Sequence, residues 1–137
     1  MTPSSGLPIG SLRRVHHIAL NVKDMEKSCH FYGHILGLKP LVGEEVPLTL
    51  KTMVEEGKVS NFITPDGTVI DLFATPDLSL PAADPHQPFT RTDHLAFDIA
   101  PEQFDQAIAV LAAHGVTIAA GPVTRPTGRG IYFYDPD

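Results

Sequence analysis

Two histidines of this 137-residue sequence occupy equivalent positions in an internal repeat. His17 lies in the segment Val-His-His-Ile-Ala-Leu, and His94 lies in the segment Thr-Asp-His-Leu-Ala-Phe. If the two copies pack about a pseudo-twofold axis, the imidazoles converge, and a carboxylate beside them would complete a site for Zn²⁺, Ni²⁺, Fe²⁺ or Mn²⁺. Because the chain has seven histidines and one cysteine, we expect a divalent metal site of imidazole and carboxylate rather than thiolate.

Asp71 is the carboxylate best suited to this site. It interrupts an apolar run, with Ile70 and Leu72 on either side. A carboxylate buried there is costly unless it is paired or binds a cation. The alternative is that strand alternation turns Asp71 toward solvent together with Val69 and Phe73. Those two neighbours are apolar, which favours the metal site.

The elements that must position these residues begin with a strand and a helix in the first copy. Alternating apolar residues predict a strand over residues 13–22. Asp24 is a good N-cap for the helix that follows, and Gly37 is a natural end for it. Further strands are expected at residues 41–46, 48–54, 59–64 and 68–74, the last two joined by a Pro-Asp-Gly turn.

The second copy repeats this order but stops early. We predict a strand over 91–99, a helix over 101–115, a strand over 116–119, a loop over 121–130 and a strand over 131–134. Asp135-Pro136-Asp137 matches the turn that precedes residues 68–74 of the first copy. The second copy therefore lacks its last strand, and we expect the natural protein to continue past Asp137.

These elements divide the chain into two modules. Residues 1–12 are rich in glycine, proline and serine and are interpreted as a flexible leader. Residues 13–74 form the first module, and residues 91–137 form the C-terminally incomplete second module. Four prolines in residues 75–90 exclude a helix or an inner strand there and indicate a linker.

Composition excludes several classes of partner. The chain has 16 acidic and 10 basic residues, a net charge of −6, which disfavours binding to nucleic acid or to an anionic membrane. No apolar run approaches the roughly 20 residues that cross a bilayer. The first ten residues do not resemble a secretory signal, so we expect a cytoplasmic protein.

The segment from Val15 to Leu38 resembles the start of vicinal oxygen chelate proteins, the glyoxalase, bleomycin-resistance and extradiol-dioxygenase superfamily. The matching pieces are His-Ile-Ala-Leu at His17, Asp24, Phe31-Tyr32 and Leu36-Gly37-Leu38. In the second copy they are Asp-His-Leu-Ala-Phe at His94 and the segment 132–137.

The resemblance implies an α+β fold of two tandem βαβββ modules, whose curved mixed sheet of eight strands surrounds an open cleft. It implies one divalent metal ion held by His17 and His94. Asp71 takes the place of an acidic or amide ligand, either as a ligand itself or, being one methylene shorter than the usual Glu, in a supporting role. The remaining ligand would be a Glu about five residues beyond Asp137.

Four further residues are candidates for binding substrate. Arg125 and Arg129 lie before a strand expected to border the cleft, and their guanidinium groups suit a carboxylate or phosphate. Tyr132 and Tyr134 share one face of that strand. The alternative is that the arginines are solvated loop residues.

The leading functional hypothesis is a metal-dependent glyoxalase-like lyase or isomerase, in which Asp71 moves a proton on a small substrate chelated through vicinal oxygens. The alternatives are an extradiol-type ring-cleavage dioxygenase, a metal-free antibiotic-binding resistance protein, and a metal-dependent thiol transfer to fosfomycin. Because paired modules of this superfamily can exchange between subunits, we expect a homodimer.

Overall fold

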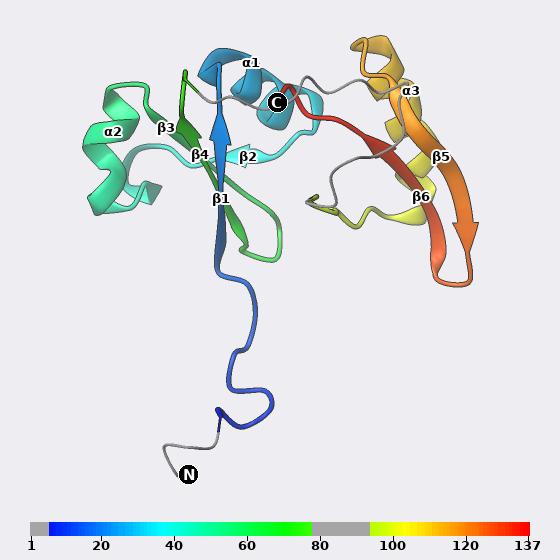
Figure 1. The fold of residues 1–137 in the computed structure, drawn as a ribbon, viewed down its shortest axis with the longest axis horizontal. Coiled ribbons are helices and arrows are strands. Elements are labelled where there is room, and N and C mark those ends of the chain that lie inside the picture. Colours follow the sequence, from blue (N-terminus) through cyan, green and yellow to red (C-terminus); the bar gives the residue numbers. More distant parts are fainter. Residues whose placement is uncertain (1–5, 78–93) are drawn as a thin grey trace.

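The first half of the chain forms a four-stranded mixed sheet (Figure 1). The structure is a computed structural model that describes residues 6–77 and 94–137. Its sheet has the order β1-β4-β3-β2, in which β1 is parallel to β4 and the other pairs are antiparallel. The strands are β1 (His17–Val22), β2 (Lys39–Pro40), β3 (Val59–Ile63) and β4 (Val69–Ala74). The predicted α+β class is confirmed.

One face of this sheet is covered by a helix that starts where the sequence indicates. Asp24 caps α1 (Met25–Cys29) by accepting a hydrogen bond from Lys27 N at 3.1 Å. The helix continues as a π-helical turn, η1 (His30–Ile35), and Gly37 follows with a φ of 72°. The buried core lies between helix and sheet and consists of Val22, Phe31, Tyr32, Phe62, Ile70 and Leu72.

Gly33 lets η1 approach β3 closely. A Cβ atom built at Gly33 would lie 2.9 Å from Cε1 of the buried Phe62 ring. Overpacking a core in this way costs about 1–3 kcal/mol. We therefore expect Gly33→Ala to lower the free energy of unfolding by about that amount in urea denaturation. Gly6→Ala, at a position with no atom within 4 Å, is the control. An unchanged stability for Gly33→Ala would contradict this account of the packing.

The predicted strands over 41–46 and 48–54 are wrong. The segment instead folds into short helical turns because local hydrogen bonds satisfy its backbone: Val46 N donates to Gly43 O, and Leu50 N donates to Pro47 O. Gly43 has a φ of 58°, a conformation that suits a turn better than a strand. The resulting elements are η2 (Gly43–Glu45), η3 (Leu48–Leu50) and α2 (Lys51–Glu55).

The second half contains a helix and a two-stranded ribbon. The helix predicted over 101–115 is present as η4 (Pro101–Gln103) and α3 (Phe104–Ala113). The loop predicted over 121–130 is wrong, since most of it pairs in β5 (Ile118–Arg125) and β6 (Gly128–Phe133). Pro122 is tolerated because it lies within a register shift, where the ladder is already interrupted.

The strand predicted over 91–99 is not formed in its described part, residues 94–99. In the first module, β1 gains its partner from β4. The described residues of the second half contain no counterpart of β4, so this backbone has no parallel strand to pair with. Described residues thus form six strands in two sheets, rather than the eight-stranded sheet that the resemblance implied.

The two halves meet at the helix of the first module, and the C-terminus lies beside α1 (Figure 1). The Phe31 and Phe133 ring centroids are 6.2 Å apart. Tyr32 Oη donates to Asp135 Oδ2 at 2.5 Å, and Lys23 N donates to Asp137 Oδ1 at 3.3 Å. Within residues 6–77 and 94–137, no helix is long and apolar enough to cross a bilayer.

Candidate metal and substrate site

Asp71 lies on the sheet face opposite the helix. In the parallel pair, His17 is in register with Val69 and Ala19 with Asp71. Because strand residues two apart share a face, His17 and Asp71 lie on the same face of neighbouring strands. On β1, this face is exposed at His17, Ala19 and Asn21. His17 and Asp71, both predicted from the sequence as site residues, therefore lie beside exposed residues of β1.

The Asp71 carboxylate is buried, with 6% of the residue exposed. The alternative that strand alternation turns it toward solvent is therefore wrong. It accepts one hydrogen bond, from Asn61 Nδ2 to Oδ1 at 2.6 Å, and no ion pair is formed with it by any described residue. A buried carboxylate with so little compensation costs several kcal/mol, which a bound cation would offset. The donor chemistry at Asp71 thus fits a divalent metal ion.

Asn61 is a site residue that sequence reasoning missed. It is paired in register with Asp71 and is 3% exposed. Its Oδ1 atom is buried without a hydrogen-bond partner. A signal was present in the sequence. Asn61 is the one amide in the strand Val59–Ile63, and Asp71 is the one carboxylate in the neighbouring strand.

The two histidines are placed differently. His17 is exposed at the start of β1, and its Nδ1 lies 3.0 Å from Nδ1 of His16. His94 is exposed in a segment without strand structure. Across the described ranges, no group of three or more His, Cys, Asp or Glu side chains is arranged to hold a metal ion. The structure brings His17 and Asp71 to one face and does not bring His94 to them.

The candidate substrate residues divide between two faces of the β5–β6 ribbon. Arg129 lies against α3, with its guanidinium 4.4 Å from the Phe104 ring centroid and Nη1 donating to Asp105 Oδ1 at 3.1 Å. Arg125 Nη1 donates to Tyr132 Oη at 3.2 Å. Because side chains alternate along a strand, Tyr132 and Tyr134 belong to one face of the ribbon and Arg129 belongs to the other. Arg125 and Tyr132 therefore form a polar pair away from α3.

This division predicts different effects for the two arginines. Arg129→Gln should lower the free energy of unfolding by about 0.5–1 kcal/mol, because the contact with Phe104 is lost. Arg125→Gln should leave stability unchanged and weaken binding of anionic substrates. Urea denaturation of both variants checks the first point, and KM values check the second. Equal losses of stability would show that both arginines are structural.

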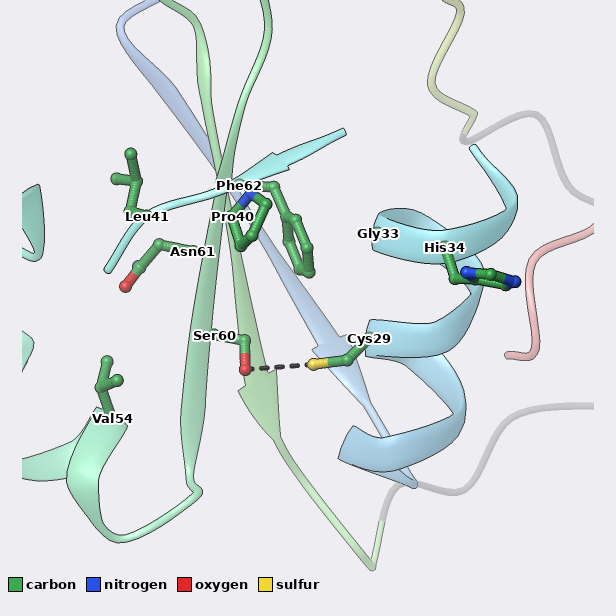
Figure 2. Close-up of a pocket in the computed structure, with 9 residues that line it drawn as sticks. All are labelled: Cys29, Gly33, His34, Pro40, Leu41, Val54, Ser60, Asn61 and Phe62. Carbon is green, nitrogen blue, oxygen red and sulfur yellow. Dashed lines mark hydrogen bonds between the residues drawn. The ribbon is translucent and has the colours of Figure 1, made fainter. Parts of the chain in front are cut away.

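A pocket of about 460 Å³ is lined by residues of α1, η1, β2, α2 and β3 (Figure 2). The Cys29 thiol donates to Ser60 Oγ at 3.1 Å, and Ser60 and Phe62 point toward the helix that carries Cys29. Asn61 points the other way, toward the side on which Val54 of α2 lies. Asn61, the hydrogen-bond partner of Asp71, lines this pocket, whereas His17, Asp71 and His94 do not.

The mixed sheet thus has α1 packed against one face and carries Asp71 and His17 on the other. Residues 14–137 match the Glyoxalase/Bleomycin resistance protein/Dioxygenase superfamily. The chain belongs to this superfamily. The crystal structure of a glyoxalase/dioxygenase from Nostoc punctiforme is 59% identical, with a TM-score of 0.89 over 99% of this chain and 92% of that one.

Other relatives have more varied descriptions. The uncharacterised protein YwkD of Bacillus subtilis is 33% identical, over 92% of this chain and 91% of its own length. The metallothiol transferase FosB of Lysinibacillus sphaericus is 27% identical, over 93% and 78%. The fosfomycin resistance protein FosX of Listeria monocytogenes, crystallised as a point mutant with Mn(II) and 1S,2S-dihydroxypropylphosphonic acid, is 25% identical, with a TM-score of 0.63 over 90% and 85%.

Proposed function

We propose that this protein is a divalent-metal-dependent enzyme of the glyoxalase-like type, acting on a small substrate chelated through vicinal oxygens. His17, His94 and Asp71 are the proposed ligands of Zn²⁺, Ni²⁺, Fe²⁺ or Mn²⁺. The observation that carries the proposal is the buried Asp71 carboxylate, which has one hydrogen bond and shares a face with exposed His17. A buried carboxylate with one hydrogen bond still carries a cost of desolvation, and a bound cation would offset that cost.

When bound, the metal ion would act as a Lewis acid for negative charge on the substrate oxygens. The chain's own residues supply the remaining chemistry. Asp71 is the proposed proton carrier, because a carboxylate beside the substrate oxygens can accept a proton and return it. Arg125 and Tyr132 can donate hydrogen bonds to an anionic substrate group from the β5–β6 ribbon.

A second candidate is a fosfomycin-type resistance enzyme. The FosX complex contains Mn(II) and a phosphonic acid that bears two adjacent hydroxyl groups. Such a ligand joins vicinal oxygens to an anion, the two features that the proposed metal site and Arg125 would recognise. FosB, a further relative, is described as a metallothiol transferase.

The test is the metal content of the full chain, purified without chelator and measured by elemental mass spectrometry. About one transition metal ion per chain is expected. Turnover of a hemithioacetal would then identify an isomerase, turnover of fosfomycin a resistance enzyme, and oxygen-dependent cleavage of a catechol an extradiol dioxygenase. A chain that stays metal-free after incubation with Zn²⁺, Ni²⁺, Fe²⁺ and Mn²⁺ would overturn the proposal and favour a metal-free antibiotic-binding protein.

The cytoplasmic location, the homodimer and the division into modules at residues 13–74 and 91–137 stay predictions from the sequence. Light scattering of the purified chain tests the homodimer directly. A mass of twice 14.8 kDa is expected.

A further inference from the structure

Asn61 and Asp71 form a buried polar pair in the middle of the sheet. They face each other on β3 and β4, and both are more than nine-tenths buried. Asn61 Nδ2 donates to Asp71 Oδ1 at 2.6 Å. No other described residue donates a hydrogen bond to this carboxylate.

The two polar atoms of the Asn61 amide are placed differently. The amide nitrogen of Asn61 carries two N–H donors, and it is this atom that faces Asp71 Oδ1. Asn61 Oδ1 must then face away, and it is buried there without a partner. An apolar residue of similar size would avoid this orphaned acceptor. Asn61 therefore supplies the hydrogen bond of Asp71 and leaves its own acceptor Oδ1 unpaired.

We propose that Asn61 is a positioning residue for the metal ligand Asp71: by occupying Oδ1, it leaves Oδ2 as the oxygen that binds the metal ion. Carboxylates that ligate metals are commonly oriented by such hydrogen bonds. Residues of β1 on the same face, at Ala19 and Asn21, are exposed, which leaves room beside the carboxylate. The inference rests on the proposed function, since it assigns Asp71 to a metal ion.

The experiment is a Co²⁺ titration of the full chain, followed by visible absorption. Asn61→Leu keeps the size of the side chain and removes the donor, so the Co²⁺ Kd should rise about 10- to 100-fold. At saturating Co²⁺, the absorption spectrum should also change, because an unrestrained Asp71 can bind through both oxygens. A purely structural role would leave the spectrum of the saturated protein unchanged.

Ser28→Ala is the matched control. Ser28 Oγ is also buried without a partner, but it lies on the helix, on the other side of the sheet. Its removal should leave both Kd and spectrum as in the wild type. Asn61→Val, which suits a strand, replaces Asn61→Leu if circular dichroism shows that the leucine variant is unfolded.

The outcomes separate the two proposals. If the wild type does not bind Co²⁺, or binds it equally well after Asp71→Asn, the proposed metal site fails and this inference falls with it. If Asp71→Asn weakens Co²⁺ binding but the Asn61 variant keeps the wild-type Kd or the wild-type spectrum, the metal site stands and the positioning role of Asn61 is overturned.

Discussion

Asp71→Asn is expected to weaken metal binding at least about 100-fold, more than is typical for residues that only support a ligand. The same change should leave the metal-free protein as stable as the wild type or more stable. The amide has the size of the carboxylate and can still accept the hydrogen bond from Asn61 through its own oxygen. The substitution also removes a buried charge for which no described residue provides an ion pair.

A loss of metal affinity without a loss of stability distinguishes a metal ligand from a structural residue. Isothermal titration with Zn²⁺ or Mn²⁺ measures the affinity, and urea unfolding of the metal-free chain measures the stability. Asp98→Asn, at an exposed position, is the control and should change neither quantity. A loss of stability with unchanged metal affinity would mean that Asp71 serves the fold and not a metal site.

Tyr32→Phe should lower the free energy of unfolding by about 1.5–3 kcal/mol at neutral pH, the range for hydrogen bonds to charged groups. The phenol is buried and donates to Asp135 at 2.5 Å, which joins η1 to the C-terminal segment. The substitution removes one oxygen and leaves the ring, so the effect reports the hydrogen bond rather than the packing. Urea denaturation at neutral pH measures it.

The burial of Tyr32 makes the stability of the fold depend on alkaline pH. Burial, reinforced by the negative charge of Asp135, raises the pKa of Tyr32 well above its ordinary value. In the unfolded chain a tyrosine loses its proton near pH 10, while folded Tyr32 keeps its own. The unfolded state therefore binds fewer protons, and stability is complete below about pH 10 and falls by about 1.4 kcal/mol per pH unit above it.

Urea denaturation between about pH 8 and 11 tests this dependence. The stability difference between wild type and Tyr32→Phe should shrink above about pH 10, because only the wild type carries this contribution. Tyr134→Phe leaves Tyr32 in place and should run parallel to the wild type. A difference that stays constant over the whole range would contradict the assignment to Tyr32.

Local signals predicted β1, α1, β3 and β4 well, whereas the strands predicted over 41–46 and 48–54 are wrong. Alternation over His17–Val22 reflects one covered face, and Asp24 caps the following helix as expected. The errors fall where neighbours decide the structure. Residues 94–99 alternate like β1 but have no described partner strand, and residues 121–130 pair in a ribbon despite their glycines and prolines. The periodicity of a single segment does not show whether a partner strand is available to pair with it.

The site was predicted in part for the same reason. A carboxylate in an apolar strand signals a costly burial, so Asp71 stood out, and its register with β1 places His17 on its face. The hydrogen bond from Asn61 depends on the register of β3 against β4, and the alternation within either strand alone does not show that Asn61 faces Asp71. The contact of Arg129 with Phe104 likewise joins residues from separate elements.

The hydrogen bond between Tyr32 and Asp135 also has a consequence for synthesis of the protein on the ribosome. All strands of the first sheet have been made once Ala74 is added, but the acceptor for Tyr32 arrives 61 residues later. At about 5–20 residues per second, that interval lasts about 3–12 s. During it, the nascent chain carries the Phe31 and Tyr32 side of its helix without the segment that later covers it. Chaperones that recognise exposed aromatic surface would meet the protein in this interval.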